Sequence, residues 1–195
     1  AALNTILATA HASLGNRDVA KELLAEALAT QPDYVPARLA DIRETAANKD
    51  LTGARSKIDA LLSKNPNNPE ALLIKGNLLS IDGDASSALA EYRKAIDAKP
   101  AYLAAHSAAI TALLLANKID DAVKQLEALK AVAPKHPQTF YFDAQLKYQR
   151  KEFKAAREPA QQLLRILPNN PMALQVAGAI EFQLRSYLQA ETYLA

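Results

Sequence analysis

Residues 69–102, PEALLIKGNLLSIDGDASSALAEYRKAIDAKPAY, contain two helical patterns separated by a short break. The first pattern is an apolar stripe at helical spacing, made of Leu72, Leu73, Gly76, Leu78 and Leu79. A second stripe follows over residues 88–96. At the break, Gly83 can take the left-handed backbone conformation that ends a helix, and Asp84 can cap the next one. We therefore expect a hairpin of two antiparallel helices, each about 13–15 residues long.

The same pattern of two helical stripes and a break recurs along the whole chain with a period of 34 residues. Five prolines keep this spacing, namely Pro32, Pro66, Pro100, Pro134 and Pro168. Six alanines keep it twelve residues earlier, namely Ala20, Ala54, Ala88, Ala122, Ala156 and Ala190. Because proline makes up only about 5% of average proteins, such regularity indicates an internal repeat rather than chance.

Counting each repeat so that its proline falls at position 32 divides the chain into five full units and most of a sixth. The units are 1–34, 35–68, 69–102, 103–136, 137–170 and a partial 171–195. One hairpin cannot bury both of its apolar stripes, so neighbouring hairpins must stack. We therefore expect residues 1–195 to form one continuous array, and we interpret it as a fragment of a longer protein.

The pattern resembles the tetratricopeptide repeat (TPR), a 34-residue helix–turn–helix with small or aromatic residues at fixed places. In the third unit, Gly76 takes the small eighth position, Ala88 position 20, Tyr92 position 24, Ala95 position 27 and Pro100 position 32. The resemblance covers the whole chain. It implies an all-α, right-handed superhelical solenoid of stacked antiparallel hairpins, in which the first helix of each unit lines a concave groove.

Within that family, the phrase GNLLSIDGDASSALAEYRKAIDAKP is similar to alanine-rich bacterial arrays associated with exopolysaccharide and exosortase loci. That resemblance implies a bacterial protein of the cytoplasm or periplasm, with the periplasm favoured.

Several positions depart from the family pattern. The fourth position is never tryptophan; it is Asn4, Arg38, Leu72, His106, Phe140 and Leu174 in turn. The eighth position is large at Ile42 and Ile110, which predicts that the paired helices of repeats two and four are pushed apart or shifted in local register. Pro159 falls inside the second helix of repeat five and predicts a kink near residues 155–159.

Composition excludes several function classes. Lysine plus arginine number 23 and aspartate plus glutamate 21, so no charge excess favours a nucleic-acid partner. The chain has no cysteine, which excludes disulfides and thiolate metal sites. It has no apolar run of the roughly 20 residues that span a bilayer, so we expect no direct membrane insertion. No HExxH pattern, nucleophile elbow or phosphate-binding glycine loop is present, so we expect no metal, no cofactor and no enzymatic activity.

The family resemblance implies that positions 2, 5, 9, 12 and 13 of each unit face the groove. The candidate partner-binding residues are Leu39, Arg43, Leu73, Asn77, Ser107, Thr111, Tyr141, Gln145, Tyr148 and Gln175. Polar side chains interspersed with apolar ones suit an extended peptide whose backbone needs hydrogen bonds. Because Leu39 and Leu73 stand at fifth positions, the basic residues of the family's carboxylate clamp are missing there, and we do not expect an acidic C-terminal tail as ligand.

Five of the eleven aromatic residues lie in repeat five, and two of them, Tyr141 and Tyr148, are predicted to face the groove. Large rings with a polar tip make good anchors for a partner. The alternative is that both tyrosines fill a wider gap between units.

Three functions remain open from the sequence. The leading one is a non-catalytic scaffold that binds a peptide or protein of unknown identity in the groove. The second is a structural array that self-associates through its terminal repeats, since neither end has a polar capping helix. The third is a regulatory domain of a larger envelope or exopolysaccharide-related bacterial protein.

Overall fold

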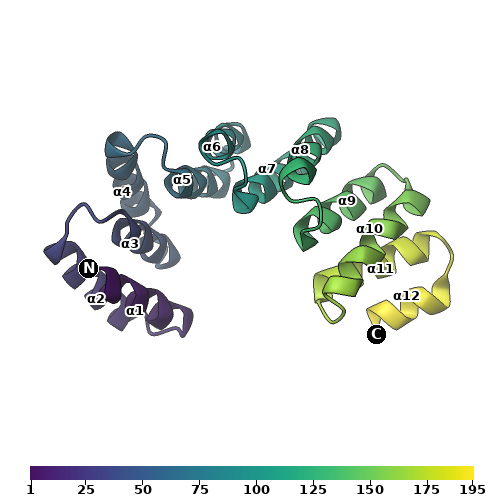
Figure 1. The fold of residues 1–195 in the computed structure, drawn as a ribbon, viewed down its shortest axis with the longest axis horizontal. Coiled ribbons are helices and arrows are strands. Elements are labelled where there is room, and N and C mark those ends of the chain that lie inside the picture. Colours follow the sequence, from purple (N-terminus) through teal and green to yellow (C-terminus); the bar gives the residue numbers. More distant parts are fainter. The chain divides into compact units, whose positions relative to one another are not determined.

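The computed structural model describes all of residues 1–195 and contains twelve α-helices and no strand. The helices alternate as first and second members of six hairpins (Figure 1). The first helices are α1 (Ala2–Ser13), α3 (Val35–Ala47), α5 (Pro69–Ile81), α7 (Leu103–Leu115), α9 (Pro137–Gln149) and α11 (Pro171–Gln183). The second helices are α2 (Arg17–Thr30), α4 (Leu51–Lys64), α6 (Ala85–Ala98), α8 (Ile119–Val132), α10 (Phe153–Ile166) and α12 (Tyr187–Leu194). The predicted all-α fold of stacked hairpins is confirmed.

Every hairpin turns on a residue with left-handed backbone, and this residue recurs at the 34-residue period. Its φ angle lies between 54° and 83° in all six turns, at Gly15, Lys49, Gly83, Asn117, Lys151 and Arg185. Only two of the six are glycine, the residue that takes this conformation without strain. The left-handed turn is therefore kept even where no glycine is present to take it without strain.

Side chains at the helix starts satisfy backbone groups that the helix leaves unpaired. Asp84 accepts a hydrogen bond from the backbone N–H of Ser87 at 3.0 Å, and Asn68 accepts one from Ala71 at 2.8 Å. The hydrogen bonds that the Asp84 carboxyl accepts stabilise its charged form, and those from Ser87 are the main reason that its pKa lies below the ordinary value. Both caps stand where the sequence predicts a helix to begin.

The recurring alanines lie where the two helices of a hairpin meet. All six are buried, with exposed fractions of 0% for the first five and 3% for Ala190. The approach is equally close at Gly76, where an added Cβ would lie 2.4 Å from the ring of Tyr92 and 3.1 Å from the carbonyl oxygen of Ala88. Small residues at these places are therefore a steric requirement of the hairpin.

Ile42 and Ile110 replace the small eighth residue in repeats two and four, and both are buried. The α3–α4 and α7–α8 hairpins have fewer close backbone approaches than the hairpins with alanine or glycine at that position. This is the looser pairing that a large side chain predicts.

Polar fourth-position residues are satisfied inside the protein. His106 is 1% exposed; its Nε2 lies 2.8 Å from the carbonyl oxygen of Pro100, and its Nδ1 lies 2.8 Å from Nε2 of Gln125. Arg38 donates from Nε to the carbonyl oxygen of Pro32 at 2.6 Å. At Arg38 and His106 the missing tryptophan is thus replaced by a hydrogen bond to a proline carbonyl in the loop that precedes the helix.

Pro159 lies inside α10 without ending it. This helix is 14 residues long, as are α2, α4, α6 and α8. The proline ring is buried on the same side as Ala156, Ala160 and Leu163. The helix is therefore continuous through Pro159, and the kink expected near residues 155–159 stays a prediction.

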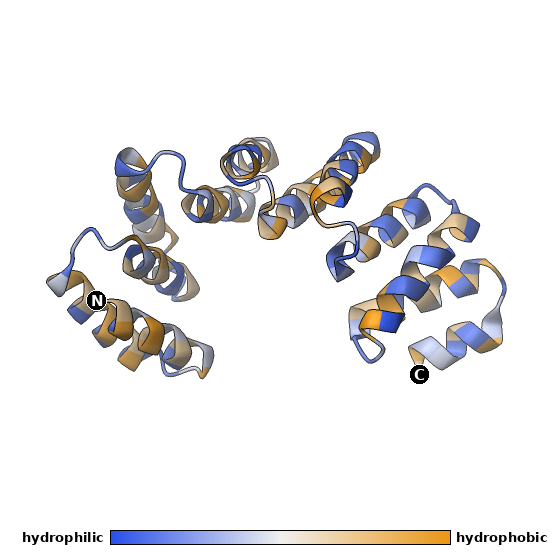
Figure 2. Cartoon of the chain, viewed as in Figure 1, coloured by the Kyte–Doolittle hydropathy of each residue, from blue (hydrophilic) through white to orange (hydrophobic).

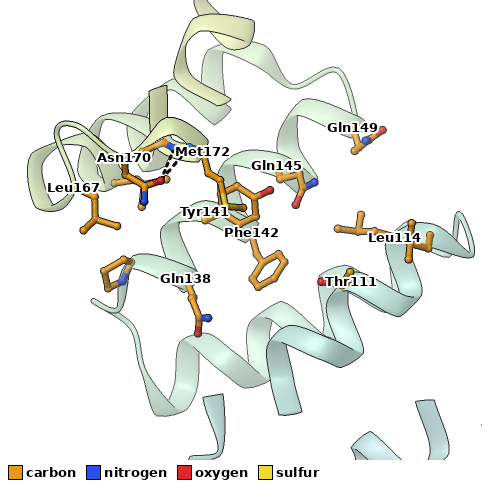
Figure 3. A pocket seen from close by; sticks show the side chains of 14 residues that line it. Thr111, Leu114, Gln138, Tyr141, Phe142, Gln145, Gln149, Leu167, Asn170 and Met172 are labelled. Atoms are coloured by element: carbon orange, nitrogen blue, oxygen red, sulfur yellow. Dashed lines mark hydrogen bonds between the residues drawn. The ribbon is translucent and has the colours of Figure 1, made fainter. Parts of the chain in front are cut away.

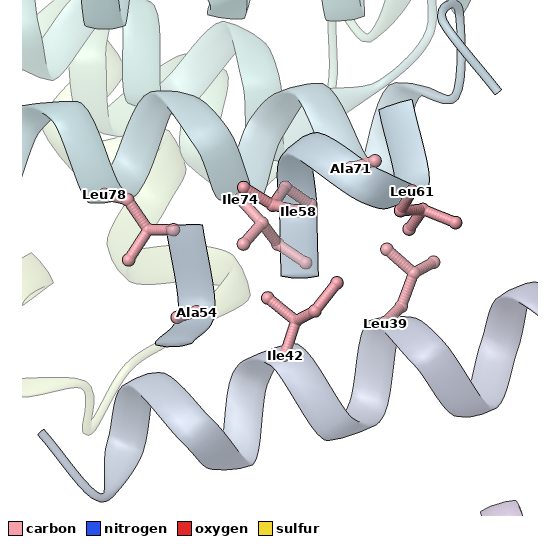
Figure 4. Close-up of a cluster of buried hydrophobic side chains, with 8 residues drawn as sticks. All are labelled: Leu39, Ile42, Ala54, Ile58, Leu61, Ala71, Ile74 and Leu78. Atoms are coloured by element: carbon pink, nitrogen blue, oxygen red, sulfur yellow. The ribbon is translucent and has the colours of Figure 1, made fainter. Parts of the chain in front are cut away.

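The chain divides into two compact units, residues 1–99 and 100–195, each with three hairpins. Whether all six hairpins form one array stays a prediction. In the first unit, Leu39 and Ile42 of α3 meet Ile58 and Leu61 of α4 and Ile74 of α5 (Figure 4). Figure 2 shows hydrophilic loops between α2 and α3 and between α4 and α5, with the hydrophobic residues along the helices. None of the helices combines the length and apolarity needed to cross a membrane.

The turns allow a clean test of backbone strain. Gly83 has a φ of 81°, and a Cβ added there would meet no atom within 4 Å. Gly83→Ala should therefore lower the free energy of unfolding by about 1 kcal/mol through backbone conformation alone. Urea denaturation measures the change, and Lys49→Gly should not destabilise, because Lys49 has a φ of 66°. Equal stability of Gly83→Ala and the parent would contradict this account of the turns.

Candidate partner-binding groove

A pocket of about 570 Å³ lies in the second unit and is open to solvent. Its walls come from the first helices α7, α9 and α11, together with the end of α10 and the loop that follows it. This is the set of helices that the family resemblance places on the concave side. The volume falls within the range of ligand sites in proteins.

The pocket exists because α7 and α9 stay apart. The neighbouring first helices α1 and α3, and likewise α9 and α11, have several close backbone approaches, whereas α7 and α9 do not reach that proximity. Phe142 of α9 is 5% exposed and lies on the side of α9 that faces Thr111 of α7 (Figure 3). Its ring therefore forms part of the pocket lining between the two helices.

Apolar and neutral polar groups alternate around the opening. Figure 3 shows Tyr141, Phe142 and Gln145 between Thr111 and Leu114 on one side and the segment containing Leu167, Asn170 and Met172 on the other. Leu115 and Met172 are 80% and 55% exposed, and both line the pocket. Such a surface can bury an apolar group and offer hydrogen bonds beside it.

The polar groups of the pocket are available to a ligand. The side chains of Thr111, Gln138, Tyr141, Gln145 and Gln149 make no hydrogen bond within the protein, whereas Oδ1 of Asn170 accepts from the backbone of Met172 and Ala173. Partial burial raises the pKa of the Tyr141 phenol above its ordinary value of 10.0. Its hydroxyl therefore stays neutral at physiological pH and can both donate and accept.

The structure separates the ten predicted groove residues into several environments. Thr111, Tyr141 and Gln145 line the pocket. The exposed residues outside it are Arg43, Asn77 and Gln175, and the half-buried ones are Leu73, Ser107 and Tyr148. Leu39 is 6% exposed and belongs to the hydrophobic core of the first unit, so almost none of its surface is left for a partner.

Two of these residues are already engaged. The Tyr92 hydroxyl donates to Oδ1 of Asn77 at 3.0 Å. Tyr148 packs edge-on against Phe153, with ring centroids 5.3 Å apart, and against the alanine cluster between α9, α10 and α11. Tyr148 therefore does not share the pocket with Tyr141, and its surroundings match the alternative of filling a gap between helices.

The predicted set omitted most of the lining. Leu114, Leu115, Gln138, Gln149 and Met172 all line the pocket. Gln138 and Met172 stand at position 2 of their repeats, Leu114 at position 12, and Leu115 and Gln149 at position 13. All are groove positions, so the same positional rule identifies them when it is applied to every unit. Phe142 follows no such rule, because its position is not one of the groove positions.

No three His, Asp or Glu side chains come together in an arrangement that could hold a metal ion.

Comparisons with known proteins point to one family. Residues 42–102 and residues 79–146 each match a family model described as tetratricopeptide repeat. No curated protein sequence matches the chain significantly.

Solved structures show the same fold at low identity. The chain is similar to PilF of Pseudomonas aeruginosa, with 18% identity, a TM-score of 0.83, and coverage of 98% of this chain and 87% of that one. It is also similar to PilW, described as a type IV pilus biogenesis factor, with 19% identity, a TM-score of 0.81, and coverage of 98% and 89%. A repeat protein from Parabacteroides merdae has 15% identity and a TM-score of 0.74, with coverage of 97% and 75%. At these identities the likeness concerns the fold alone.

Proposed function

Because this chain belongs to the tetratricopeptide-repeat family, we propose that it is a non-catalytic scaffold that binds a peptide or protein segment in the groove formed by its first helices. The observation that supports this function is the pocket between α7, α9 and α11, with its unpaired amide and hydroxyl groups. Repeat arrays commonly present extended binding surfaces of this kind.

The mechanism is binding to a preformed surface. Tyr141 supplies a rigid ring and a neutral hydroxyl, and Gln138 and Gln145 supply amides that can pair with a partner's backbone. Since the helices already hold the backbone of this surface, the entropic cost to the protein is limited to the side chains that become ordered when the partner binds. Thr111 adds a hydroxyl from the opposite wall.

A charge placed in the pocket wall tests the proposal. Leu115→Glu should reduce capture of the bound protein segment at least tenfold, because a carboxylate there must lose water without a counter-charge when the partner binds. The matched control is Leu188→Glu, since Leu188 is 81% exposed against 80% for Leu115 and lies on α12 outside the pocket. Affinity capture from cells that make the protein, quantified by mass spectrometry, gives the measurement, and circular dichroism confirms folding. If both variants retain the same proteins as the parent, the pocket is not the binding site.

A second candidate function is self-association into a structural array. It is favoured by the face of α1 that exposes Leu3 and Ile6, each 68% exposed, and by Leu14 directly after the helix, which is 75% exposed. A further copy of the chain could stack a hairpin on this face, as neighbouring repeats do within the chain. The contact would join unlike surfaces and could continue from copy to copy.

Light scattering over a concentration series distinguishes the two functions. Self-association predicts a mass that rises with concentration and returns to that of a monomer in Ile6→Glu, because a carboxylate interrupts the apolar face of α1. A mass that stays monomeric at every concentration would exclude the structural array and leave the scaffold as the function.

A further inference from the structure

The lining of the pocket contains no charged side chain. Fourteen residues line it, and none is Asp, Glu, Lys, Arg or His. The whole chain has 23 basic and 21 acidic residues among 195, so a random sample of fourteen would hold about three. A partner that binds in this pocket therefore finds no charged side chain in the lining with which to form an ion pair.

The charged side chains of α9 are already paired. On α9, Nζ of Lys147 lies 3.2 Å from Oδ1 of Asp143, and Nζ of Lys130 on α8 lies 3.3 Å from the same oxygen. None of the three side chains lines the pocket. A charged ligand group would therefore find no free counter-charge on α9.

The cost of losing water then decides which ligand fits. A carboxylate or ammonium group that enters a neutral pocket gives up hydration without gaining a charge partner, whereas an apolar side chain gains by leaving water. Amides compensate the polar groups of a peptide backbone, because each offers one acceptor and two donors. Gln138, Gln145 and Gln149 stand along α9 and can offer these groups beside the apolar surface.

We infer that the pocket selects an extended, uncharged peptide segment and receives one bulky apolar side chain of that segment against Tyr141, Leu115 and Met172. The inference rests on the proposed scaffold function and specifies the chemistry of its ligand. An acidic tail, a basic tail and a nucleic-acid backbone are disfavoured for the same reason, since each brings charge into a neutral site.

Random short peptides displayed on phage provide the probe. Selection on the immobilised 195-residue chain should enrich peptides with a bulky apolar residue flanked by uncharged residues, and should deplete acidic and basic residues relative to the starting library. Enriched peptides are then made synthetically and titrated by fluorescence anisotropy.

Two substitutions at one position make the test specific to the pocket. Gln145→Lys and Gln145→Glu place opposite charges in the wall contributed by α9, and glutamate has nearly the shape of glutamine. Each should weaken the selected apolar peptides at least tenfold. Selection on the lysine variant should enrich acidic residues, and selection on the glutamate variant basic ones. Gln189→Lys is the matched control, because Gln189 is exposed on α12 outside the pocket, and it should leave affinity unchanged.

The outcomes separate the inference from the function on which it rests. Peptides that bind the parent, lose affinity in both Gln145 variants and are uncharged support the inference. Peptides that depend on Gln145 but are enriched in acidic or basic residues overturn the inference and leave the scaffold function standing. If no enriched peptide depends on Gln145, the pocket binds no peptide, and both proposals fail.

Discussion

The close approach of two helices at a recurring alanine is the constraint on which this structure depends. Where Ala88 of α6 meets Gly76 of α5, the backbone of one helix lies so near the other that a single added Cβ would collide with Tyr92. The turn between the helices is equally constant, since it takes left-handed backbone even at Lys49 and Lys151. The helix contact accounts for the alanine series, and the turn repeats with it at the same 34-residue period.

The candidate site arises where this close packing is relaxed. The α7–α8 hairpin, which carries Ile110, is loosely paired, and α7 and α9 lack the backbone proximity found between α1 and α3, α3 and α5, and α9 and α11. Phe142 and neutral groups such as Tyr141 and Gln145 line the resulting space. A departure from the repeat pattern therefore coincides with the surface that is best suited to a partner.

The sequence predicts the periodic parts of the molecule well. The 34-residue spacing locates all six hairpins. Burial of Leu39 was not expected, because the positional rule assigns it to the groove while the α3 helix directs it into the core of Leu61 and Ile74. The place of Phe142 in the pocket lining was also missed, since its position in the repeat is not one of the groove positions.

The stability of Ala88→Leu tests the central claim most directly. Ala88 is fully buried at the helix contact, whereas Ala90, on the same helix, is exposed and provides the matched control as Ala90→Leu. The account predicts that Ala88→Leu lowers the free energy of unfolding in urea by about 1–3 kcal/mol, because the larger side chain must force the helices apart. It predicts almost no loss for Ala90→Leu. An Ala88→Leu protein as stable as the parent would show that close helix contact at this alanine does not hold the hairpin together.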